Sequence, residues 1–62
     1  MVEVRRGDVL RLAGEAQVDP KTAEHWLRRQ RGDTTAPEVR RLSAERLEDA
    51  ARRLVARESA AP

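Results

Sequence analysis

The chain has 62 residues, with 13 Lys or Arg, 11 Asp or Glu and no Cys, so its net charge is only +2. A chain of this length forms one domain at most and buries about 60% of the surface that its unfolded form exposes. Without cysteine it has neither a disulfide framework nor a cysteine-based zinc site. No apolar run approaches the roughly 18 residues of a membrane helix, and there is no signal-peptide pattern, so we expect a cytoplasmic protein without a membrane partner.

Twelve of the 13 basic residues are arginine, whose planar fork suits phosphates and the guanine edge. Codon bias explains a high arginine and alanine content equally well, so composition alone is weak support for nucleic-acid binding. Trp26 is the only aromatic residue, which removes the stacking platform expected of a protein that binds single strands or RNA.

The first expected elements are an arm and a helix. Residues 1–6 alternate apolar and charged side chains, as in a short strand, an extended arm that reaches DNA, or a frayed terminus. Asp8 is a good N-cap for a helix over residues 8–16, on which Arg11 and Glu15 can form an i,i+4 pair. We expect Gly14 to allow a second helix to approach closely.

A second helix is predicted over residues 20–29. Asp19 is a suitable N-cap, and Pro20 is well tolerated at the first helical position because its missing N–H would have no partner there. Ala23, Trp26 and Leu27 share the inward face. Residues 31–37 form the following loop.

The segment after the loop has two interpretations. Thr35 and Glu38 match a capping box, which predicts a helix from 37 to 57; this all-helical version is preferred. Alternatively, Ser43 caps a helix over 43–57, and residues 34–42 are free to form a short two-stranded wing. In both versions we expect a single domain over 1–58 and a frayed tail at 59–62.

Small and apolar residues in the stretch 12–27 are spaced as two helices that cross through a tight turn require. This pattern resembles the helix-turn-helix of bacterial repressors such as the lactose-repressor headpiece and Cro-type proteins. The matching positions are Leu12, Ala13, Ala16, Val18, Thr22 and Ala23. Gln17 stands where the family usually has Gly, so either a non-glycine residue takes a positive φ or the turn differs; Asp19 stands where Ser is common.

A second resemblance is to the winged MerR-like and excisionase-like proteins. It rests on Thr22 and Trp26 in the second helix, on residues 39–42 as a wing, and on a helix start at Ser43. Pro37 and the lack of wing glycines and aromatics depart from that pattern. Both resemblances imply a mainly α, three-helix helix-turn-helix domain.

The resemblance implies sequence-specific binding of double-stranded DNA by a transcriptional regulator, with helix 20–29 in the major groove. Lys21, His25 and Arg28 share a stripe that would face base edges, while Glu24 is expected to face solvent. Thr22, Arg29 and Arg31 suit phosphates. Seven residues are therefore expected to contact DNA: Lys21, Thr22, His25, Arg28, Arg29, Arg31 and Arg40.

Other functions find less support. The chain offers no nucleophile with a base, no glycine-rich phosphate loop and no metal-ligand spacing, so we expect no enzyme, cofactor, metal or small-molecule ligand. The alternative is a helical protein-interaction module that uses a face made of Leu47, Ala50 and Leu54. A homodimer formed through the C-terminal helix, bound to a palindrome on the nucleoid, would combine both functions.

Overall fold

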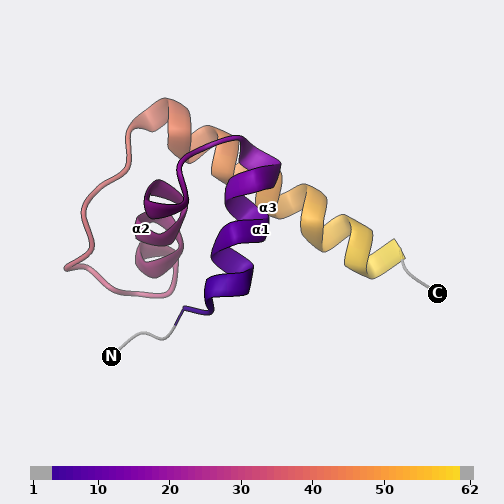
Figure 1. Cartoon of the computed structure of the whole chain (residues 1–62), viewed down its shortest axis with the longest axis horizontal. Coiled ribbons are helices and arrows are strands. Elements are labelled where there is room, and N and C mark those ends of the chain that lie inside the picture. Colours follow the sequence, from indigo (N-terminus) through magenta and orange to yellow (C-terminus); the bar gives the residue numbers. More distant parts are fainter. Residues whose placement is uncertain (1–3, 61–62) are drawn as a thin grey trace.

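The computed structural model describes residues 4–60, which fold as three helices. These are α1 (Arg6–Ala16), α2 (Pro20–Gln30) and α3 (Arg41–Ala60). In Figure 1, α2 lies at the left, α1 at the centre, and α3 runs diagonally so that its C-terminal half extends away from α2. The mainly α prediction is confirmed. No strand occurs between residues 4 and 60, so the wing at 34–42, the alternative to the preferred all-helical version, is not formed.

Helix α1 begins at Arg6, two residues before the predicted start. The N–H of Val9 donates to the Arg5 carbonyl at 3.1 Å, so the helical hydrogen bonds already start at Arg5. Arg5 is the N-cap residue and makes no side-chain cap bond, while Asp8 lies inside the first turn. The prediction of Asp8 as N-cap was wrong, although its carboxylate still complements the positive end of the helix dipole. Residues 1–3 of the expected arm lie outside the described residues.

The turn between α1 and α2 agrees with the sequence prediction. Gln17 has φ 56° and ψ 48°, so a non-glycine residue does adopt the left-handed conformation that ends α1. The N–H of Val18 donates to the Ala13 carbonyl at 3.1 Å, a bond typical of a left-handed helix end. Asp19 then caps α2 by accepting a hydrogen bond from the Lys21 N–H at 3.2 Å.

Helix α3 begins at Arg41, so both predicted starts were wrong. The Ala44 N–H donates to the Arg40 carbonyl at 2.9 Å, which places Ser43 inside the first turn. Thr35 caps no helix, because none begins at 37; its N–H and hydroxyl both donate to Asp33 within the loop. The helix runs to Ala60, beyond the predicted end at 57, so residues 59 and 60 are helical rather than a tail. Residues 61 and 62 lie outside the described part.

The core is built mainly from small side chains, which let the helices approach closely. Leu47 of α3 is fully buried, and so is Ala23 of α2. The buried cluster between the helices consists of Val9, Leu12, Ala13, Ala16, Ala23, Leu47 and Ala50. The predicted role of the inward alanines in the helix crossing is therefore confirmed. The predicted role of Gly14 was wrong, because it is exposed and a Cβ built there meets no atom within 4 Å.

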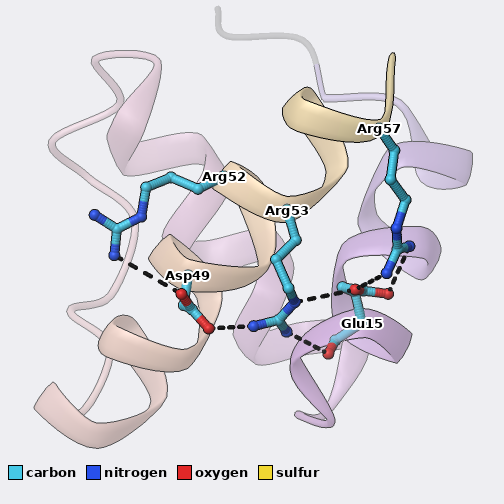
Figure 2. Close-up of polar contacts among 5 residues, drawn as sticks. All are labelled: Glu15, Asp49, Arg52, Arg53 and Arg57. Atoms are coloured by element: carbon cyan, nitrogen blue, oxygen red, sulfur yellow. Dashed lines mark hydrogen bonds and ion pairs between the residues drawn. The ribbon is translucent and has the colours of Figure 1, made fainter. Parts of the chain in front are cut away.

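An ion-pair network joins α1 to α3 at Glu15 (Figure 2). Its carboxylate accepts from Arg57 at 2.6 and 3.2 Å and from Arg53 Nε at 3.1 Å. Arg53 also donates to the Glu15 carbonyl at 3.2 Å and pairs with Asp49. Hydrogen bonds from Arg57 and then Arg53 hold the pKa of Glu15 below its ordinary value. The expected Arg11–Glu15 pair does not form, since Glu15 reaches α3 instead and Arg11 pairs with Glu58 at 3.5 Å.

Candidate nucleic-acid interface

The outer face of α2 carries a stripe of three basic side chains at helical spacing. Lys21, His25 and Arg28 lie at i, i+4 and i+7, on the side of the helix opposite the buried Ala23. Lys21 is exposed, and the other two are half-buried. The side chains of Lys21 and His25 make no hydrogen bond or ion pair with any residue between 4 and 60. Both are therefore free to contact a ligand.

Arg28 occupies the same stripe but is held by two acidic side chains. Its Nε donates to Asp33 Oδ2 at 3.1 Å, and its Nη1 lies 3.8 Å from Glu24 Oε2. The Asp33 side chain is only 12% exposed, so this contact joins the end of α2 to the loop. Glu24, which was expected to face solvent, instead lies half-buried beside Arg28. Contact of Arg28 with a base would require it to leave both carboxylates.

Arg29 ties α2 to the other side of the loop. Its Nη1 donates to the Ala36 carbonyl at 2.8 Å and to the Thr34 carbonyl at 3.5 Å. Its Nη2 lies 3.6 Å from the carboxylate of Glu38. Ala36 is itself buried, so these contacts fasten the loop at its centre. Arg29 was expected to contact a phosphate. Within the described residues its guanidinium instead binds the loop and holds it against the end of α2.

Asp33 organises the loop, and the sequence analysis gave it no role. Its Oδ1 accepts from the N–H of Thr35 at 3.0 Å and from the Thr35 hydroxyl, and its N–H donates to the Arg28 carbonyl at 2.9 Å. Hydrogen bonds from the Thr35 hydroxyl, then the Thr35 N–H, hold the pKa of Asp33 below its ordinary value, with a smaller contribution from Arg28. The available signal was the Asp-x-Thr spacing, because an Asp side chain often bonds the backbone two residues onward.

The remaining expected contacts lie apart from the stripe. Thr22 is half-buried on α2. Arg31 is exposed at the C-terminal end of α2, where its N–H donates to the Leu27 and Arg28 carbonyls. Arg40 is exposed directly before α3, and the described structure contains no hydrogen bond or ion pair from its side chain. The structure thus brings Lys21, His25 and Arg28 together and leaves Arg40 on a separate segment.

Charge is distributed unevenly over the described residues. Seven arginines form ion pairs: Arg11, Arg28, Arg29, Arg41, Arg52, Arg53 and Arg57. Between residues 4 and 60, the basic side chains without any such partner are Arg5, Arg6, Lys21, Arg40 and Arg46. Most of the paired charge lies on α3, whereas Arg5, Arg6 and Lys21 lie at the starts of α1 and α2. At those two helix starts these basic side chains lie among Asp8, Asp19 and Glu24, so what sets them apart is the lack of an ion-pair partner and not an excess of positive charge.

A shallow groove brings these two helix starts to the same surface. It is lined by Val4, Arg6, Val9, Leu10, Pro20, Lys21 and Glu24. Arg6 at the first turn of α1 and Lys21 at the first turn of α2 thus belong to one region of surface. Asp8 in the first turn of α1 and the Asp19 cap of α2 already compensate the partial positive charge of these helix N-termini, so an anion here would be held by the side chains of Arg6 and Lys21. Arg6 was expected only as part of an arm over residues 1–6 that could reach DNA; its place beside Lys21 was not expected, because only the fold brings residue 6 near residue 21.

Other kinds of site find no basis in the described part of the chain. No group of three His, Asp or Glu side chains within residues 4–60 could hold a metal ion. None of the three helices is both long and apolar enough to cross a membrane. No protein-family model matches the sequence, and no curated protein or solved structure matches it either.

Proposed function

We propose that the chain is a helix-turn-helix protein that binds duplex DNA with α2 in the major groove. The observation that carries the proposal is the outer stripe of α2, on which Lys21 and His25 have no partner among the described residues. The short turn supports it, because a left-handed Gln17 and a capping Asp19 join two helices through only three residues. At the start of α2, Pro20 and Lys21 are exposed, as docking of a recognition helix by its N-terminal end requires.

The roles follow from position and hydrogen-bonding capacity. Lys21, in the first turn of α2, donates to guanine O6 or N7, and His25 contacts the next base step on the same stripe. Thr22 donates its hydroxyl to a phosphate at the edge of the groove. Arg6 neutralises a backbone phosphate beside Lys21, since the two residues line one surface groove.

Arg28 and Arg29 act chiefly as positioning residues in this proposal. Their hydrogen bonds to Asp33 and Ala36 hold the loop against the C-terminal end of α2. A helix fixed at both ends presents Lys21 and His25 with little conformational freedom, which lowers the entropy cost of docking. Base reading is therefore assigned to the first half of α2.

A protein that binds a defined duplex in this way is suited to transcriptional regulation on the nucleoid. Repression follows wherever its binding site overlaps that of the polymerase. The alternative protein-interaction face of Leu47, Ala50 and Leu54 has little free surface, because the first two side chains are fully buried in the chain's own core.

The test is selection from a random duplex pool, followed by affinity measurement at several salt concentrations. We expect enrichment of a defined sequence and an affinity that falls steeply as salt rises. Lys21→Ala and His25→Ala should weaken binding of the enriched duplex. Arg57→Ala is the control for charge, because it also removes one basic side chain, at the end of α3 that extends away from α2 (Figure 1). Since it also breaks the Arg57–Glu15 ion pair, circular dichroism must first show that its helix content equals that of the wild type.

Two outcomes would contradict the proposal. One is failure to enrich any sequence while the protein is folded. The other is an affinity that does not change with salt. Equal losses for Lys21→Ala and Arg57→Ala would likewise show that α2 is not the binding element.

A further inference from the structure

An apolar groove remains open between α2 and the second half of α3. Its floor consists of Trp26 from α2 and of Ala51, Val55 and Ala56 from α3. Val55 is 61% exposed, although it is a large apolar residue. A second hollow continues from the same Trp26 and Val55 toward Leu27 and Leu54. Within residues 4–60, nothing covers this surface.

The charges beside the groove alternate along α3. Glu48 and Arg52 line the groove itself, and Glu58 lies one turn beyond Val55. The side chains of Arg52 and Glu58 are each 70% exposed. Within the chain, Arg52 pairs with Glu48 and Asp49 at 4.0 and 3.9 Å and Glu58 pairs with Arg11 at 3.5 Å, and these exposed pairs include no hydrogen bond. Both therefore retain hydrogen-bonding capacity for another molecule.

The spacing of these charges about Val55 is symmetric. Arg52 precedes Val55 by three residues and Glu58 follows it by three, so each lies about 4.5 Å from Val55 along the helix axis. When two copies of α3 pack antiparallel with a two-fold axis at Val55, Arg52 lies opposite Glu58 of the partner subunit. The two-fold axis repeats this ion pair, so the dimer contains two Arg52–Glu58 pairs between its subunits. Ala51 then lies opposite Ser59 of the partner subunit, and these small side chains allow close approach of the two helices.

We infer that this groove binds α3 of a second copy of the chain, forming a two-fold dimer centred on Val55. Charge complementarity selects this occupant. A DNA backbone would meet the carboxylates of Glu48 and Glu58, and a strongly acidic or basic partner would leave half of these charges unpaired. A second antiparallel copy pairs an arginine with a glutamate on both sides of an apolar centre made of Trp26 and Val55.

The inference stands independently of DNA binding, because its test is oligomeric state alone. Sedimentation equilibrium over a range of protein concentrations should show a monomer–dimer equilibrium for the wild-type chain. Arg52→Glu and Glu58→Arg should each raise the dimer dissociation constant at least tenfold. The double variant, with Arg52→Glu and Glu58→Arg together, should dimerise nearly as tightly as the wild type, because it restores both cross-subunit pairs with their charges reversed.

A cysteine at the axis gives a second, geometric test. Since the chain has no cysteine, Val55→Cys introduces a single thiol, and it should form a symmetric disulfide under mild oxidation. Such a bond requires Cα atoms within about 7 Å, as expected for residues facing each other at a two-fold axis. Arg46→Cys is the control, because Arg46 is also exposed on α3 but lies beside Gln17, away from the groove.

Circular dichroism should show the same helix content in all variants, since each replaced side chain is exposed. A wild-type chain that stays monomeric up to millimolar concentration would overturn the inference. So would a charge-reversed double variant that dimerises no better than the single variants. Equal cross-linking of the two cysteine variants would contradict the position of the axis.

Discussion

Replacing Gln17 by glycine should stabilise the chain, because Gln17 is the only non-glycine residue with a positive φ between residues 4 and 60. A left-handed conformation costs an L residue about 1–2 kcal/mol, a cost that glycine avoids. Glycine in turn loses about 0.5–1 kcal/mol more backbone entropy on folding. The exposed Gln17 side chain makes no hydrogen bond with the described residues, so its removal breaks no contact of that kind. The expected net gain is about 0.5–1 kcal/mol.

Urea unfolding followed by circular dichroism measures this difference. We expect Gln17→Gly to raise the denaturation midpoint with an unchanged slope. The melting temperature should rise by roughly 2–8 °C, since 1 kcal/mol corresponds to about 4–8 °C in a domain of this size. Gln17→Ala is the control, because alanine retains the Cβ that causes the strain. A glycine variant no more stable than the alanine variant would refute the assignment of strain to this turn.

Three further predictions concern the packing and the ion pairs. Gly14→Ala should raise stability by about 1 kcal/mol in a thermal melt, because the new Cβ on α1 meets no neighbour and alanine favours the helix. Leu47→Ala should lower stability by about 2–5 kcal/mol in urea, and an unchanged midpoint would contradict the core described above. Arg57, and to a smaller extent Arg53, lowers the pKa of Glu15 in the folded state. The ionised Glu15 carboxylate therefore contributes fully to the free energy of unfolding above its ordinary pKa of 4.5, and this contribution is lost as the pH falls through the lowered pKa. Glu15→Gln should therefore flatten the acid side of a stability–pH profile below about pH 4.5, and an identical profile for wild type and variant would exclude this contribution.

The turn and α2 could be predicted from sequence because their signals are local. Asp19 and Pro20 mark a helix start within two residues, Ala13 and Ala16 lie three residues apart on α1, and Ala23 shares a face of α2 with Trp26 and Leu27. These signals depend little on the rest of the chain. The structure accordingly has α2 at Pro20–Gln30, one residue longer than predicted.

The start of α3 could not be predicted, because two competing local signals, at Thr35 and at Ser43, occur within nine residues. Neither signal is used, because Asp33 engages Thr35 and Arg28, and Arg29 donates to the Ala36 carbonyl; these contacts hold the chain after α2 as a loop up to Arg40. The hydrogen bonds of Glu15 were also beyond local reasoning, since they join residues 38 and 42 positions apart. The same limit applies to Arg6, which joins the candidate interface only through the packing of α1 against α2.

The central claim is that the outer face of α2 reads bases in duplex DNA, and the most direct measurement compares Lys21→Ala on two duplexes. On the selected duplex, we expect a loss of about 1–3 kcal/mol, or roughly 5- to 150-fold in Kd, because a base contact disappears. On an unrelated duplex at the same salt concentration, the loss should be much smaller, so that specificity relaxes. Equal losses on both duplexes, or no loss on either, would contradict base reading by Lys21.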